Sequence, residues 1–432
     1  MKIEIEKLLR QPKMTALVII VLMSVYVYLA FAANIDTFSG YDREYFLTHE
    51  DYREWLMSKQ AEKVDEAWIS KTKKEYRSLI DENMYSADEI AERLGWEKKN
   101  GFSVDYTVDD VLADPYNIEY AFDLLPSKVF YSHDMESFYP SVFDIYIPLA
   151  EDAVGYLHES YEKVNRISEE NNGISYAECM GYSEAQLNDY WDFVDRRYRD
   201  FELTVGYCLG WDILCTAMQF LPYTLGLALI VVLGSLFSQE KSCGMVPILR
   251  TAKNGRARLL QQKLMIALCT ATALWLLFQL VMLLAVALSY TLQGAECTAM
   301  AFDGKPSIYG FTWLEYYLVQ CAFSYCGTLV FALFVCCTSS LMSLKLLMPL
   351  NLVITLFCGI PINRFCFADT AFSLLDKLKA ITPPQLMAAY PNLQVYQSYE
   401  LGSCIVQLAY VMAAATLAEA VLMLLLLKKQ EG

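Results

Sequence analysis

The residues best suited to recognition chemistry form one basic segment between two long apolar runs. Residues 240–263 separate the apolar runs 221–237 and 264–288. The segment contains six basic side chains, Lys241, Arg250, Lys253, Arg256, Arg258 and Lys263. A short basic loop between two membrane spans faces the cytoplasm by the positive-inside rule. These residues therefore predict a cytoplasmic surface whose basic groups pair with acids of a partner or with lipid phosphate.

One carboxylate lies within the last apolar run of the chain. An ionisable group inside a span, here Glu419, is costly to bury and marks a functional site by default. Glu419 could line a transport path, or it could pair with Lys428 or with a hydroxyl group of a neighbouring span. The amides of Gln279, Gln320, Asn351 and Gln407 are expected to form hydrogen bonds between helices.

Common motifs for nucleotide binding and hydrolysis are absent from the sequence. It contains no G-x-x-x-x-G-K-[ST] phosphate loop, no glycine-rich dinucleotide fingerprint, no H-E-x-x-H and no G-x-S-x-G. The 13 cysteines show no metal-ligand spacing. The sequence thus predicts no catalytic residue, no metal site and no cofactor in this chain. Cys179 and Cys208 could form a disulfide, and free thiols are the alternative.

Membrane spans are the elements that must position these residues. Hydrophobic residues form 55% of the chain, more than a soluble protein of this length needs. Six apolar runs reach or approach the length of a transmembrane helix: residues 14–33, 214–237, 264–290, 314–339, 345–362 and 403–427. The fifth run is the weakest, because it is short and contains Pro349.

Acidic side chains are concentrated in one block of the chain. Residues 34–213 hold 39 acidic and 17 basic side chains, a net charge of −22, and the rest carries +6. An acidic surface of this kind argues against nucleic acid as a partner. The basic residues before the first run, in the 240–263 segment and at the C-terminus predict cytoplasmic termini and an extracellular acidic block. Alternatively, residues 1–32 are a cleaved signal peptide, because residues 30–32 fit a cleavage site.

Periodicity within the acidic block predicts a mainly helical structure. Apolar residues follow helical stripes over residues 50–80 and 149–170. Residues 86–89 and 183–186 have the spacing of capping boxes, and the first is expected to start a helix that ends at Gly95.

Together these patterns predict an all-α polytopic membrane protein with six transmembrane helices. Residues 1–33 are expected to form an amphipathic entry helix and span 1. Residues 34–213 would form a large, mainly helical extracellular domain inserted between spans 1 and 2. Residues 214–432 would form spans 2–6, with a cytoplasmic coupling loop at 238–263.

The spacing within the basic segment resembles that of a known family. The similarity lies in an E-x-x-x-G…L…R-x-x-L-x-x-x-K pattern of ABC-2-type (type 2 exporter) ABC transporter permeases, formed here by Glu240, Gly244, Leu249, Arg256, Leu259 and Lys263. Residues 5–13 also resemble the entry helix of that family. Met245 departs from the usual threonine, and residues 254–255 replace a usual pair of small residues. The resemblance covers residues 1–33 and 214–432 and leaves the acidic block unmatched.

The resemblance implies a permease subunit of an ABC exporter in a bacterial plasma membrane. A separate cytoplasmic ABC ATPase subunit would bind ATP and Mg and would dock on the coupling residues Glu240, Gly244, Leu249, Arg250, Arg256, Leu259 and Lys263. A second permease copy or a paralogue would complete the transporter. Its cargo would be an amphiphile, namely a lipid, a peptide or an antimicrobial. The alternative is a non-transporting membrane sensor or scaffold whose extracellular domain binds a ligand or partner.

Overall fold

Helices make up most of the structure, a computed structural model that describes residues 12–38, 60–99, 106–117, 142–172, 183–234, 236–237, 255–300, 309–341, 344–359, 378–388, 393, 396–402 and 404–431. The helices before the second predicted span are α2 (Pro12–Phe38), α5 (Glu66–Asn83), α6 (Ala87–Lys99), α7 (Val108–Ala113), η1 (Val142–Tyr146), α10 (Ile147–Glu151), α11 (Ala153–Asn172) and α13 (Glu184–Tyr198). Those that follow are α14 (Leu209–Ala217), η2 (Met218–Phe220), α15 (Leu221–Leu233), α18 (Gly255–Ser289), α19 (Trp313–Leu341), α20 (Leu344–Gly359), α23 (Pro383–Met387) and α25 (Leu408–Glu431). Four short strands complete the described elements, β1 (Glu62–Lys63), β2 (Thr204–Val205), β3 (Ser398–Leu401) and β4 (Cys404–Gln407).

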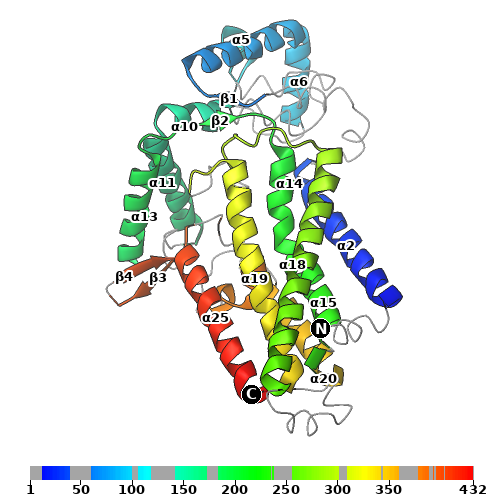
Figure 1. Cartoon of the computed structure of the whole chain (residues 1–432). Coiled ribbons are helices and arrows are strands. Elements are labelled where there is room, and N and C mark those ends of the chain that lie inside the picture. The colour runs from blue at the N-terminus through cyan, green and yellow to red at the C-terminus, as the bar shows by residue number, and fades with distance from the viewer. Residues whose placement is uncertain are drawn as a thin grey trace.

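Among the described residues, five helical segments are long and apolar enough to cross a membrane. They are Lys13–Ala32 in α2, Leu209–Leu233 across α14, η2 and α15, Arg258–Ser289 in α18, Trp313–Leu341 in α19 and Leu408–Lys429 in α25. The segments pack side by side in one bundle (Figure 1). The prediction of a helical, multi-pass membrane protein is therefore confirmed.

The predicted fifth span corresponds, among the described residues, to a short apolar helix only, so six spans are not confirmed. Its residues form α20, which has Pro349 in its interior and an apolar stretch of only Met348–Cys358. The short helix α23 packs against α19 and also contacts α20. Gln385 of α23 donates a hydrogen bond to the carbonyl oxygen of Cys358 at 2.7 Å. This bond connects α23 to the last described turn of α20.

The core of the bundle surrounds α15, which contacts α2, α18, α19 and α20. Phe278 of α18 and Phe331 of α19 are fully buried there. Tyr26 of α2 is buried against Phe278, with ring centroids 5.8 Å apart, and Ala30 is buried as well. These two residues join α2 to the core, whereas most of the apolar surface of this helix is exposed.

Hydrogen bonds between helices confirm two of the four predicted amide contacts. The Tyr317 hydroxyl of α19 donates to Gln279 Oε1 of α18 at 3.5 Å, whereas Gln407 lies in strand β4 and not in a helix. Asn351 of α20 donates a hydrogen bond from its Nδ2 to Thr338 Oγ1 of α19 at 3.0 Å. Gln320 of α19 is fully buried, yet neither of its side-chain polar atoms has a hydrogen-bond partner among the described residues. The prediction of an interhelical hydrogen bond is therefore wrong for Gln320.

The cap, defined as the described residues between 60 and 207, lies at one end of the bundle (Figure 1). Its main core forms where α10, α11 and α13 meet and contains Leu149, Val194 and Leu203. The capping box predicted at residues 183–186 is confirmed. Gln186 N donates to Ser183 Oγ at 3.2 Å, and Ser183 N donates to Gln186 Oε1 at 3.0 Å.

Two helix boundaries in the cap differ from the prediction. Helix α6 starts beside Ser86, whose backbone N–H donates to Glu89 Oε2 at 2.8 Å, but it continues through Gly95 to Lys99. A glycine inside a helix costs only about 1 kcal/mol relative to alanine, so Gly95 does not have to end one. The helical stripe predicted over residues 50–80 is interrupted, because residues 62–63 form β1 and α5 begins at Glu66; residues 50–59 lie outside the described residues.

The junction connects the cap to the bundle and consists of residues 60–64, 203–208, 291–300 and 309–313. Strands β1 and β2 are antiparallel, with Glu62 opposite Val205. On the other side of β2, the backbone N–H of Thr298 donates to the carbonyl of Thr204 at 2.8 Å. Thr298 also forms a β-bridge with Thr312. Four segments that are distant in the sequence therefore lie side by side beneath the cap.

A hairpin of β3 and β4 forms a second attachment between the cap and the bundle (Figure 1). Gln186 of α13 donates to the carbonyl of Ser398 at 2.8 Å and to its hydroxyl at 3.2 Å. The Tyr396 hydroxyl donates a hydrogen bond to the carboxylate of Asp189. Gly402 at the turn has a φ of 67°, a conformation that glycine adopts without strain. Helix α25 follows the hairpin directly.

Candidate functional site

Four of the predicted coupling residues lie outside the described residues: Glu240, Gly244, Leu249 and Arg250. The backbone of Arg256 belongs to the first turn of α18. Leu259 is half-buried in the same helix, and Lys263 is buried one turn later. The segment that we expected to be a loop up to residue 263 is therefore helical from Gly255 onward.

Lys263 contacts the interior of the bundle. Only 1% of its surface is exposed, and its ammonium nitrogen lies 4.4 Å from the centroid of the Phe237 ring. A desolvated ammonium group over an aromatic face is a favourable cation–π contact. A partner protein could not reach Lys263 in this position. The residue therefore anchors the start of α18 to the segment that follows α15.

A hydroxyl of α19 joins the same cluster. Ser339 Oγ donates to the carbonyl of Gly234 at 2.8 Å and accepts a hydrogen bond from the backbone N–H of Phe237 at 3.3 Å. Gly234 follows the last residue of α15, where helix carbonyls lack partners within the helix. The described residues on either side of the 238–254 segment are thus held by three membrane helices, α15, α18 and α19.

Glu419 lies within α25 and is half-buried. Its Oε2 atom is buried and has no hydrogen-bond partner among the described residues. Lys428 is nine positions further along the helix, a rise of about 13 Å, so an ion pair between these two residues is ruled out. A role in a transport path stays a prediction.

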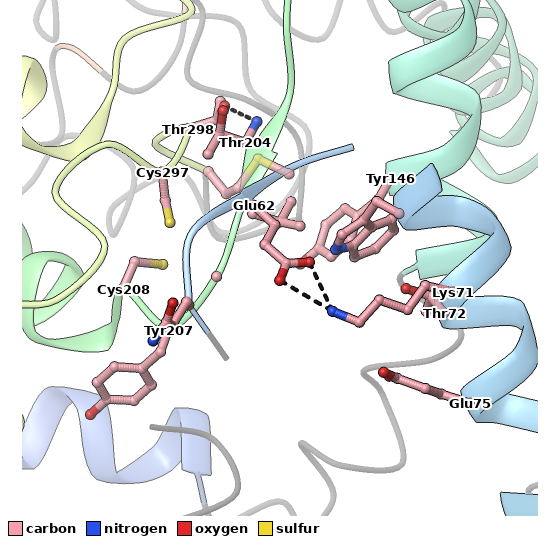
Figure 2. A pocket seen from close by; sticks show the side chains of 15 residues that line it. Glu62, Lys71, Thr72, Glu75, Tyr146, Thr204, Tyr207, Cys208, Cys297 and Thr298 are labelled. Carbon is pink, nitrogen blue, oxygen red and sulfur yellow. Dashed lines mark hydrogen bonds and ion pairs between the residues drawn. The ribbon is translucent and has the colours of Figure 1, made fainter. Parts of the chain in front are cut away.

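A cavity of about 340 Å³ opens between α5 and the junction (Figure 2). Its wall combines ionisable, aromatic, hydroxyl and thiol side chains, namely Glu62, Lys71, Glu75, Trp68, Tyr146, Tyr207, Thr72, Thr204, Thr298, Cys208 and Cys297. A cavity of about this volume is large enough for a small molecule, and most of the side chains on its wall carry a polar atom. Because the wall includes α5, β2 and the 297–300 segment, a ligand there would contact both the cap and the loop before α19.

The wall of the cavity carries both charged and aromatic side chains. Lys71 Nζ lies 3.2 Å from both carboxylate oxygens of Glu62, and both side chains are partly exposed. Such an exposed pair adds little stability. Burial raises the pKa of Tyr146 to about 12, so its phenol is neutral at physiological pH. The cavity therefore offers one ion pair and a neutral aromatic surface to a ligand.

Two thiols face each other on the same wall (Figure 2). Cys208 is the N-cap residue of α14, and Cys297 belongs to the loop between α18 and α19. The sequence-based hypothesis paired Cys208 with Cys179, which lies outside the described residues. The sequence holds no spacing motif that brings Cys297 to Cys208, because the junction forms only through tertiary contacts.

The two arrangements differ in the chemistry that they permit. The cluster around Lys263 joins the ends of the 238–254 segment to three helices, and the junction cavity has room for a small molecule beside two thiols. Within the described part of the chain, no group of three or more His, Cys, Asp or Glu side chains could hold a metal ion. Comparisons with protein-family models, with curated proteins and with solved structures give no match.

Proposed function

We propose that this chain is the permease subunit of an exporter that a separate cytoplasmic ABC ATPase drives. The proposal rests on the resemblance of residues 240–263 to the coupling segment of ABC-2-type permeases. Two permease subunits, identical or related, would form the transporter in a plasma membrane. The cargo class, a lipid, peptide or another amphiphile, follows from the family resemblance alone.

The contacts that hold both ends of the 238–254 segment against the bundle are the observation that best supports this function. Lys263 holds the start of α18 over Phe237, and Ser339 ties Phe237 and Gly234 to α19. A force on the loop would therefore act on α15, α18 and α19 together. An ATPase that pushes on the loop needs this kind of rigid connection to change the packing of a transport path.

The distribution of charge supports the orientation that the proposal requires. The start of α2 and the end of α25 lie at the end of the bundle away from the cap (Figure 1). Lys13 is at the first of these ends, and Lys428 and Lys429 are at the second. The acidic cap would then face the outside, and the basic end would face the cytoplasm.

Affinity purification of the full chain from native membranes tests the proposal. We expect an ABC ATPase among the associated proteins that mass spectrometry identifies. The double variant Glu240→Ala with Arg256→Glu should lose most of this ATPase, because the change removes the charges of the docking pattern. The variant Lys263→Met should retain the ATPase but lose stimulation of ATP hydrolysis by amphiphiles, because the loop is no longer fastened to Phe237.

A charge reversal elsewhere at the same end of the bundle provides the control. Lys13→Glu changes an exposed basic residue at the start of α2 and should leave the recovery of the ATPase unchanged. Recovery of the ATPase in equal amounts with the double variant would show that residues 240–263 are not the docking element.

The junction cavity favours a second candidate, a sensor that relays ligand binding to a cytoplasmic enzyme. A ligand there would touch both the cap and the loop that leads into α19. The same purification separates the two functions. A kinase in place of an ABC ATPase among the associated proteins would favour the sensor.

A further inference from the structure

A tight turn brings Cys297 next to Cys208 (Figure 2). The backbone N–H of Cys297 donates to the carbonyl of Gly294 at 3.1 Å, which closes a β-turn. The two ends of such a turn lie within about 7 Å of each other. A Cβ atom on Gly294 would lie 3.1 Å from Cys208 Cβ. The end of the turn therefore returns the chain to Cys208, with both sulfur atoms on the wall of the cavity.

Backbone hydrogen bonds hold the two segments in this register. Thr298 N donates to Thr204 O at 2.8 Å, and Thr204 N donates to Thr298 Oγ1 at 3.1 Å. On the other side, Trp313 N donates to Cys297 O at 2.9 Å. The thiols thus meet on a framework that is fixed on both sides, and a bond between them would need little rearrangement of the backbone.

The two thiols differ in acidity. A hydrogen bond from the Cys208 thiol lowers the pKa of Cys297, although burial and the nearby Glu296 carboxylate oppose this effect. The same hydrogen bond, together with burial and the charge of Asp212, raises the pKa of Cys208. An unequal pair of this kind is typical of reactive dithiols, in which one sulfur is the nucleophile.

We propose that Cys208 and Cys297 are a redox dithiol, which a peroxide that enters the junction cavity oxidises to an intramolecular disulfide. The Cys297 thiolate attacks one oxygen of hydrogen peroxide, the O–O bond breaks, and hydroxide leaves. This step oxidises Cys297 to a sulfenic acid by two electrons. The Cys208 sulfur then attacks the Cys297 sulfur, the S–O bond breaks, and the Cys208 proton leaves with the hydroxyl group as water. The net reaction converts two thiols and one peroxide into one disulfide and two waters.

The disulfide would link the start of α14 covalently to the loop before α19. It would also replace two S–H groups on the wall of the cavity, next to Tyr207 and Thr298. Oxidation would therefore fix the junction and change the site that a ligand meets. This reaction does not depend on the orientation of the chain in the membrane or on the identity of its partner.

Treatment of the purified full chain with hydrogen peroxide tests the proposal. The protein is first reduced, then oxidised, and its remaining thiols are alkylated with N-ethylmaleimide before digestion. We expect mass spectrometry to show one cross-linked peptide pair that contains Cys208 and Cys297 and that dithiothreitol reverses. Recovery of both cysteines in alkylated form, at a peroxide dose that oxidises the exposed Cys404, would overturn the proposal.

Single variants separate the two steps. In Cys208→Ser the resolving thiol is missing, so Cys297 should stay a sulfenic acid that dimedone traps. Cys297→Ser should abolish both the cross-link and the dimedone adduct. Cys404→Ser, which removes an exposed thiol at the hairpin, should leave the cross-link unchanged. A cross-link from Cys208 to any other cysteine would also contradict the pairing.

Discussion

Replacement of Gly327 by alanine should separate α23 from α19. A Cβ atom at this position would lie 2.4 Å from the carbonyl carbon of Leu386 and 2.6 Å from the backbone nitrogen of Met387. Carbon atoms pack at about 3.5 Å, so the backbone of α23 would have to move by about 1 Å. The atoms in the way belong to the backbone, and no side-chain rotation can relieve the clash.

Three effects decide the magnitude of this destabilisation. Overpacking costs about 1–3 kcal/mol. A shift of α23 also weakens the bond from Gln385 to Cys358, worth about 1 kcal/mol. Alanine offsets about 1 kcal/mol of the sum, because it is a better helix former than glycine. We therefore expect Gly327→Ala to lower the free energy of unfolding by about 2 kcal/mol.

Thermal unfolding of the full chain in detergent measures this effect. A thiol-reactive dye reports the exposure of buried cysteines such as Cys215 and Cys336 during unfolding. Gly226→Ala in α15 is the matched control, because a Cβ there would meet its nearest atom, Thr355 Cγ2, at an ordinary 3.4 Å. A Gly327→Ala variant that is as stable as both the wild type and Gly226→Ala would refute the packing of α23 against α19.

Two further substitutions test buried amides by the same unfolding assay. Gln320→Met should raise the free energy of unfolding by about 2 kcal/mol, because both amide atoms are buried without a partner among the described residues; a loss of stability would show that the amide is satisfied. Gln186→Met should lower it by about 2 kcal/mol and speed hydrogen exchange of the β3–β4 amides, because the buried Ser398 carbonyl loses its donor. Asn188→Ala, an exposed position on the same helix, is the control, and equal exchange in both variants would contradict the role of Gln186.

Local patterns in the sequence were sufficient to predict most of the helices. The apolar runs at 264–290 and 314–339 correspond to α18 and α19, because membrane insertion depends on the composition of a contiguous stretch. The capping box at 183–186 formed because all its hydrogen bonds lie within four residues. Such elements depend little on the rest of the chain.

Non-local packing explains what the sequence did not predict. The run 345–362 is apolar enough to suggest a span, but in its described part, α20, the apolar stretch covers only Met348–Cys358, and α23 packs beside it against α19. The close approach that Gly327 permits has no local signal in the sequence. Lys263 is a basic residue of the kind expected to dock on a partner. Its contact with Phe237, at the other end of the 238–254 segment, instead places it inside the bundle. The junction cavity likewise forms from segments that meet only in the folded chain.

The two attachments of the cap limit how it can move. The junction connects it to α14 and to the loop before α19, and the hairpin connects α13 to the start of α25. A rotation of the cap about the junction would have to break the bonds from Gln186 to Ser398 and from Tyr396 to Asp189. A movement that keeps both attachments must instead carry α19 and α25 along, and these two helices pack against each other. Cap position and bundle packing are therefore coupled, so a ligand or a disulfide at the junction would act on the membrane helices directly.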